Sequence, residues 1–264
     1  MIDVHCHLNF SNFDKDIENV IKKAKEAGVE KIINVGTNIN ESKKVVELAS
    51  RYKNLYAIVG VHPHDADKLD KNWLDELEII ARMPKVLGIG EIGLDYFQHE
   101  IGREVNHNIQ KEVFSKQIEL SIKLKLPIQI HSRKASKDII EILKFYKKDF
   151  LKIPGMFHCF AGRIDYLKNV LDLGFYIGFD GNITYKGLAP GEDTMLSELV
   201  KTTPIEKIVV ETDAPFLTPI PKRGSRNEPS YVIIVGESIA KIKGTSFDEV
   251  NKITTLNSKN IFNL

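Results

Sequence analysis

The chain has 264 residues, of which 37 are Lys or Arg and 36 are Asp or Glu, so its formal net charge is +1 at pH 7. This balance argues against a protein that coats nucleic acid through a uniformly basic surface, because such binding depends on many uncompensated cations. The sequence has no apolar run long enough to span a bilayer, no signal peptide before Ile2, and only two cysteines, Cys6 and Cys159, which together predict a cytoplasmic protein without membrane attachment.

Short apolar runs alternate with amphipathic segments along the chain. The predicted strands are Ile2–Leu8, Glu30–Gly36, Leu55–Val61, Val86–Ile92, Leu126–His131, Lys152–His158, Phe175–Phe179 and Glu206–Glu211. Helical spacing of apolar residues predicts helices over Glu41–Tyr52, Trp73–Arg82, Arg103–Leu124, Lys137–Phe150, Tyr166–Leu173, Pro229–Ile242 and from Phe247 onward. Mostly apolar strands that alternate with helices are typical of parallel pairing, so we expect a single-domain (β/α)8 TIM barrel over residues 1–264, with a doubly wound open sheet as the alternative.

The first predicted strand carries two histidines on one face. His5 and His7 are two residues apart, and alternate side chains of a strand point the same way. Two imidazoles at one strand end can bind a metal ion together; the alternative is a polar pair on a half-exposed edge strand. Asp3 shares the face of His5 and is a candidate hydrogen-bond partner, whereas alternation turns Cys6 away, toward packing.

Four later strands end in potential metal ligands: Glu91, His131, His158 and Asp213. In a barrel, the carboxyl ends of all strands meet around one mouth, and His, Asp and Glu are costly to bury without partners. Each residue alone fits a polar group that caps a loop, but all of them at one rim, together with the two histidines of the first strand, favour a shared site. A set of this size exceeds the three protein ligands of a catalytic zinc and suits two divalent ions.

The sequence resembles the TatD-type metal-dependent deoxyribonucleases, a branch of the amidohydrolase-like barrels, over nearly its whole length. The matching motifs are IDVHCHL (2–8), GVHPH (60–64), GEIGLDY (90–96), IHSR (130–133), HCF (158–160), ETDAPFL (211–217) and RGSRNEP (223–229). Ala161, Asp180 and the long loop 181–193 depart from the commoner family pattern, which bears on substrate specificity rather than on the type of reaction.

The resemblance implies a pair of divalent ions, Mg²⁺, Mn²⁺ or Zn²⁺, and a fixed set of ligands. Those ligands are His5, His7 and Asp213 for one ion, His131 and His158 for the other, and Glu91 as the bridge. The implied reaction is attack of a metal-bridged hydroxide on a phosphodiester, with Asp213 orienting the water or taking its proton. Some related barrels use a carbamylated lysine as the bridge at the end of the fourth strand, and Glu91 at this position favours the phosphoesterase branch.

The implied activity is that of a deoxyribonuclease or exonuclease that removes nucleotides from single-stranded or damaged DNA, with RNA as a further substrate. We expect a monomer without a stable protein partner. A hydrolase of C–N or carboxylic ester bonds is the alternative, because metal-activated water serves both reactions. A metal-stabilised barrel with a scaffold role is a third, non-catalytic reading.

Several further residues are candidates for substrate contacts. His62 and His64, on either side of Pro63, fit a phosphate contact or a proton donor, and equally a turn-capping pair. Arginine forks suit phosphate, with surface ion pairs as the alternative. The candidate arginines are Arg133, Arg223 and Arg226.

Aromatic residues outside the strand ends offer a second kind of contact. Tyr96 and Trp73 can each stack on a base or pack against the protein. His99 and His107 fall outside the ligand pattern, and we expect both to be solvated.

Overall fold

The structure is a computed structural model that describes residues 1–97 and 105–264. Its strands are β1 (Ile2–Cys6), β2 (Lys31–Val35), β3 (Leu55–Val59), β4 (Val86–Asp95), β5 (Ile128–Arg133), β6 (Gly155–Phe157), β7 (Tyr176–Phe179) and β8 (Ile208–Val210). They form one parallel sheet of eight strands in the order in which they occur along the chain.

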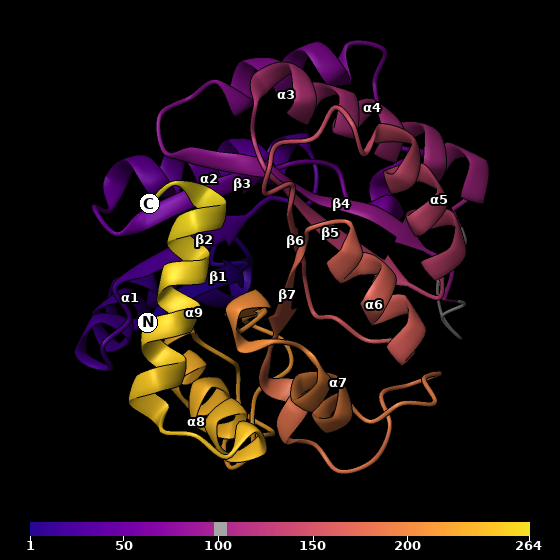
Figure 1. Ribbon diagram of the computed structural model, residues 1–264. Helices are drawn as coiled ribbons and strands as arrows, with labels where there is room; N and C mark the ends of the chain where they lie inside the picture. Colours follow the sequence, from indigo (N-terminus) through magenta and orange to yellow (C-terminus); the bar gives the residue numbers. More distant parts are fainter. Residues whose placement is uncertain (98–104) are drawn as a thin grey trace.

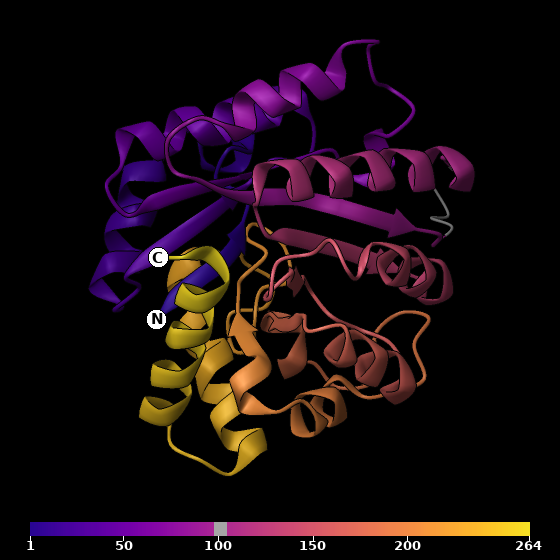
Figure 2. The same ribbon diagram turned by 45° about the horizontal axis from the view of Figure 1, so that its top comes forward.

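The helices are α1 (Ile17–Glu26), α2 (Ile39–Arg51), α3 (Trp73–Ala81), α4 (His107–Leu124), α5 (Ser136–Tyr146), α6 (Ile164–Asp172), α7 (Leu196–Thr202), α8 (Val232–Lys243) and α9 (Phe247–Phe262). Short 3₁₀ helices are η1 (Ser11–Phe13), η2 (Pro63–Asp65), η3 (Gly181–Thr184), η4 (Ile205–Lys207) and η5 (Pro229–Tyr231). The helices lie outside the strands (Figures 1 and 2). Within residues 1–97 and 105–264, none of them has the length and apolar character needed to cross a membrane.

The sheet closes between its first and last strands. Cys6 forms a parallel bridge with Ala214, just after β8, and the His7 amide donates to the Ala214 carbonyl at 2.7 Å. The Asp213 amide also donates to the His5 carbonyl at 2.9 Å. Sequential strand order with this closure confirms the predicted (β/α)8 barrel over the doubly wound sheet, and it brings Asp213 beside the strand that carries the two histidines.

Several strands contribute apolar side chains to one buried cluster. Ile2 and Val4 of β1 belong to one buried cluster with Val209 of β8, and α9 contributes Ile261 and Phe262 to it. Figure 1 draws α9 in yellow, with both chain ends close to it. Asp3, His5 and His7 interrupt the apolar pattern of β1 and its end although all three are buried, so their polar groups require partners in the interior.

Helices α1 and α7 were not predicted from the sequence. In α1 only Val20, Ile21 and Ala24 are buried, and the charged residues around them obscure the helical period. β4 continues to Asp95, three residues beyond the predicted end at Ile92, whereas β6 and β8 are shorter than predicted. Helix α4 begins at His107, and its predicted start at Arg103 lies outside the described residues.

Candidate metal centre

Three side chains at the closure between β1 and β8 direct their polar atoms to a common point. The Nε2 atoms of His5 and His7 are 3.0 Å apart. Asp213 Oδ1 lies 3.6 Å from His5 Nε2 and 3.5 Å from His7 Nε2. The three residues form one of the clusters of His and acidic groups close enough to hold a metal ion.

The hydrogen bonds on the far side of the two rings fix which nitrogens face this point. His7 Nδ1 lies 2.9 Å from the Val35 carbonyl oxygen, and His5 Nδ1 lies 2.8 Å from Gln129 Oε1. Gln129 turns its oxygen to His5 because its Nε2 donates to the Val4 carbonyl at 2.9 Å. Both Nδ1 atoms therefore donate, and each Nε2 is the remaining acceptor position of its ring. A cation between the two Nε2 atoms satisfies both rings, so this donor set fits a metal ion.

The Glu91 carboxylate lies between two sets of histidines. Its Oε2 is 3.7 Å from His5 Nε2 and 3.8 Å from His7 Nε2. Its Oε1 is 2.9 Å from His131 Nδ1, 3.6 Å from His62 Nε2 and 3.7 Å from His158 Nε2. One oxygen of a buried carboxylate thus faces each set, which is the arrangement that a bridging ligand requires.

Asp95 forms a hydrogen bond with Nε2 of His131, the ring nitrogen that faces away from Glu91. His131 Nε2 donates to Asp95 Oδ2 at 3.1 Å, and His64 Nε2 reaches the same oxygen at 3.0 Å. Burial alone would lower the pKa of His131, but Asp95 and Glu91 outweigh it and raise that pKa to about 9. Asp95 was not among the predicted site residues, although its spacing from Glu91 along β4 puts both carboxylates on the same face of the strand.

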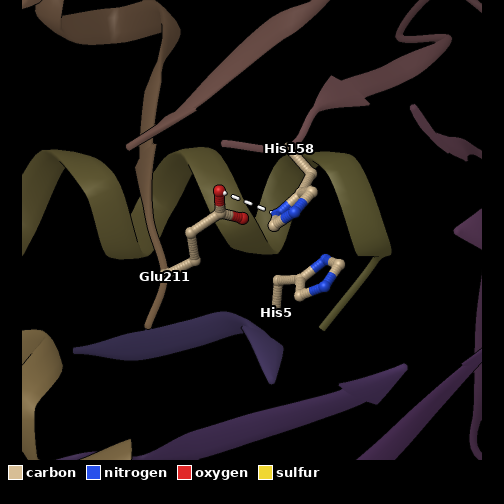
Figure 3. A group of neighbouring side chains, drawn as sticks. All are labelled: His5, His158 and Glu211. Carbon is tan, nitrogen blue, oxygen red and sulfur yellow. Dashed lines mark hydrogen bonds and ion pairs between the residues drawn. The ribbon is translucent and has the colours of Figure 1, made fainter. Parts of the chain in front are cut away.

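Glu211 forms a corresponding hydrogen bond with Nδ1 of His158, the ring nitrogen that faces away from Glu91. Figure 3 shows the Glu211 carboxylate pointing to His158, with His5 beside them. His158 Nδ1 lies 3.1 Å from Glu211 Oε1. The His5 and His158 rings stack with centroids 3.6 Å apart, and the three residues form a further cluster able to hold a metal ion. Burial would lower the pKa of His158, but Glu211 and Glu91 outweigh it and raise the pKa to about 10.

A glycine in β7 makes room for Glu211. A Cβ atom at Gly178 would lie 2.7 Å from Glu211 Oε1, closer than packed atoms approach. The same Oε1 accepts a hydrogen bond from the Cys159 amide at 2.6 Å. Glu211 was also missed as a site residue; its position as the last residue of the predicted eighth strand was the available signal.

A cavity of about 580 Å³ opens over these groups. The predicted site residues that line it are His7, His62, His64, Glu91, Arg133, His131, His158 and Asp213. His5 is fully buried beneath them. The described residues that line the cavity do not include Tyr96, Arg223 or Arg226.

The two histidines in the turn after β3, His62 and His64, have features of both predicted roles, a turn cap and a contact in the cavity. His62 Nδ1 accepts the His64 amide at 3.2 Å and so caps η2, while both side chains also line the cavity. Burial lowers the pKa of His62 to about 3. His62 is therefore neutral at pH 7, with its Nε2 proton directed to the cavity side.

Each of the three arginines lies over an aromatic ring. The Arg133 guanidinium lies 3.8 Å from the centroid of the Phe97 ring at the edge of the cavity. Arg223 is exposed, and its guanidinium lies 4.0 Å from the centroid of the Tyr185 ring. Of these two, only Arg133 is placed to meet a group inside the cavity.

Tyr96 contacts other side chains of the protein through both its hydroxyl and its ring. Its hydroxyl donates to Asp138 Oδ2 at 2.8 Å, and its ring stacks on His107 with centroids 3.6 Å apart. His107 is half-buried, so the prediction that it is solvated is wrong. Trp73 is buried in the outer core, and His99 lies outside the described residues.

The positions that depart from the family pattern lie at or beside the cavity. Ala161 lines it, and so does Glu192 of the 181–193 loop, whose Oε1 is 3.6 Å from Lys134 Nζ. Asp180 is buried and caps η3 through the Asn182 amide. Burial, with Glu211 and Asp213 nearby, raises the pKa of Asp180 to about 7, so Asp180 carries less than a full negative charge at neutral pH.

Arg226 forms an ion pair away from the cavity. Its guanidinium donates to both carboxylate oxygens of Asp16 at 2.8 Å and to the Asn12 carbonyl at 2.6 Å. It also lies 4.4 Å from the centroid of the Phe13 ring. These contacts tie the segment after β8 to the segment before α1, and they favour the ion pair, which is the alternative prediction for Arg226, as a structural role.

We expect Arg226→Ala to lower the free energy of unfolding by about 1 kcal/mol, the upper end for a partly exposed ion pair, and to leave turnover near the wild-type value. Urea denaturation measures the difference, with Arg223→Ala as the matched control, because Arg223 pairs with no carboxylate among residues 1–97 and 105–264. Arg226 lowers the pKa of Asp16, so this stabilisation is present above the usual aspartate pKa and is lost as the pH falls through the lowered value. An effect of Arg226→Ala that is confined to KM would contradict the structural role.

Comparison with known proteins gives a consistent result over the whole chain. Residues 2–263 match the family model described as TatD related DNase. The chain is 39% identical to the uncharacterized metal-dependent hydrolase YabD of Bacillus subtilis, covering 100% of this chain and 99% of that protein. It is 33% identical to the 3'-5' ssDNA/RNA exonuclease TatD of Klebsiella pneumoniae, covering 100% and 98%. The crystal structure of the TatD homologue YJJV of Escherichia coli superposes with a TM-score of 0.90 at 30% identity, covering 100% and 98%.

Proposed function

Because this chain belongs to the TatD related DNase family, we propose that it is a metal-dependent phosphodiesterase that acts as an exonuclease on single-stranded DNA or RNA. The observation that carries the proposal is the position of Glu91, with one carboxylate oxygen facing the histidines of β1 and the other facing His131 and His158. The relatives named 3'-5' ssDNA/RNA exonuclease support the substrate class and the direction of cleavage.

We assign the ligands to two divalent ions, Mg²⁺, Mn²⁺ or Zn²⁺. One ion would be held by His5, His7 and Asp213 and the other by His131 and His158, with Glu91 shared between them. When bound, the ions would acidify a water molecule and neutralise charge on the phosphate. The outer contacts of the histidine rings support this assignment, since Gln129, the Val35 carbonyl, Asp95 and Glu211 each occupy the nitrogen that faces away from Glu91.

Other side chains would orient the substrate and move protons. Asp213 is 9% exposed, so its carboxylate reaches the cavity and can accept the proton of an attacking water. Neutral His62 can donate a hydrogen bond from its Nε2 to a phosphate oxygen. Arg133, held against the Phe97 ring at the cavity edge, is the residue best placed to pair with a neighbouring phosphate.

The proposal is tested with 5'-end-labelled single-stranded DNA and RNA in the presence of each metal. We expect progressive shortening from the 3' end, and turnover of a chromogenic phosphodiester. Glu91→Gln protein, purified in the same way, is the control for contaminating nucleases. Metal-loaded protein that hydrolyses members of an amide and lactone panel but no phosphodiester would overturn the proposal in favour of C–N or carboxylic ester hydrolysis, and protein inert on every substrate would favour a scaffold.

A further inference from the structure

One wall of the cavity is aromatic. Phe216 lines the cavity and is 51% exposed, and Phe10 lines it beside Phe216 and is half-buried. Their rings meet edge to face, with centroids 6.1 Å apart and an interplanar angle of 70°. Scattered exposed apolar residues are common on protein surfaces. Phe216 differs because its exposed ring lines the same cavity as Glu91, His131 and Asp213.

The aromatic wall is joined directly to the candidate metal ligands. The Phe216 amide donates to the Asp213 carbonyl at 2.8 Å, so the ring and the carboxylate are on the same turn. The Phe10 ring stacks on the His7 imidazole with centroids 4.8 Å apart and an interplanar angle of 6°, and the Phe216 ring is 6.4 Å from the same imidazole. His7 and Asp213 therefore fix both phenyl rings at the edge of the metal centre.

The described part of the cavity divides by chemistry. The buried ionisable groups that line it are His7, Glu91, His158 and Asp213, which we call its floor. Arg133 also lines it, and Phe10 and Phe216 supply its aromatic side chains. A nucleotide divides in the same way, into a phosphate that suits the floor and a flat base that suits an aromatic face. Base stacking on a phenyl ring accepts any base, which fits an enzyme that removes successive nucleotides irrespective of sequence.

We propose that Phe216, held in place by Phe10, is the stacking platform for the nucleobase next to the phosphate that is cleaved. This inference rests on the proposed nuclease function and adds a substrate-binding residue to it. A phenyl ring that stacks one base supplies about 1–3 kcal/mol, which corresponds to a change of about 5-fold to 150-fold in kcat/KM.

The test compares intact single-stranded DNA with strands that lack one base. The substrates carry a tetrahydrofuran abasic residue at either the terminal or the penultimate position of the 3' end. We expect Phe216→Ala to lower kcat/KM on the intact strand at least 5-fold, mostly through KM. We expect the wild-type enzyme to lose a similar factor on one of the two abasic strands, and Phe216→Ala to lose nothing further on that strand. Phe216→Tyr, which keeps a stacking ring, should retain wild-type discrimination.

Phe145→Ala is the matched control, since Phe145 is 79% exposed on α5 and is absent from the lining of this cavity. It should behave as the wild type on every strand. Equal cleavage of intact and abasic strands by the wild type would overturn the base platform and leave the nuclease proposal standing, as would an equal loss on all strands in Phe216→Ala. A wild-type enzyme that cleaves none of the strands would overturn both proposals.

Discussion

Glu91→Gln should lower kcat/KM on a phosphodiester by about 10³-fold or more while the barrel remains folded. Loss of one preorganised charged contact at a reacting centre costs about 10²–10³-fold, and Glu91 faces both histidine sets at once. Glutamine keeps the shape of the side chain but offers one neutral oxygen in place of two charged ones. It therefore cannot serve two cations, and the variant should lose transition-state stabilisation rather than structure.

The measurement is steady-state turnover of a chromogenic phosphodiester, with circular dichroism to check the fold. Glu119→Gln is the matched control, because Glu119 is a carboxylate whose partner is the Tyr146 hydroxyl on the outside of the barrel. It should retain wild-type turnover. Turnover of Glu91→Gln within 10-fold of the wild type would refute the role of Glu91 as the shared ligand.

Removal of metal should abolish activity and also lower the thermal stability of the protein. The donors converge in a buried pocket where His5, His7 and Glu91 are each less than 5% exposed, so a cation bound there is held by the folded state alone. A ligand that binds only the folded state at 100 times its dissociation constant stabilises the fold by about 2.7 kcal/mol. Treatment with a chelator should therefore lower the melting temperature by several degrees, and Mg²⁺, Mn²⁺ or Zn²⁺ should restore both properties.

Asp213→Asn tests whether the fall in melting temperature on chelation comes from metal bound at this site rather than from metal bound elsewhere on the protein. Asp213 Oδ1 faces both histidines of β1, so the variant should bind metal more weakly and show a smaller change in melting temperature on chelation. Asp16→Asn, which changes an aspartate outside the cavity, should show the full wild-type change. A wild-type melting temperature that is insensitive to both chelator and added metal would contradict a metal centre built from these residues.

Local patterns in the sequence were sufficient to predict the barrel and the positions of its strand-end donors. The period of apolar residues distinguishes strand from helix over a few residues, and strand alternation predicts that His5 and His7 share a face. Since parallel barrel strands all end at one rim, order along the chain already places Glu91, His131 and His158 near one another. Helix α1 escaped prediction because its buried face is only three residues wide within a charged segment.

Tertiary structure alone decided what the long side chains contact. Arg226 pairs with Asp16, which is 210 residues away in the sequence, and Tyr96 turns to Asp138 and His107, so neither lines the described cavity. Glu211 reaches His158 through the space left at Gly178, and Phe216 takes its place in the wall through contacts with Phe10 and Asp213.

The strand-end positions could be predicted and the side-chain contacts could not, because the first depend on neighbouring residues and the second on residues far apart in the sequence. The direction in which a residue leaves a strand is set by its own backbone and repeats every two residues, so the sequence by itself determined the rim and the residues that surround it. The end point of a flexible side chain is set by the partner that offers the best charge and shape. That partner comes from any part of the chain, so only the closed barrel decided which of these residues reach the candidate metal centre.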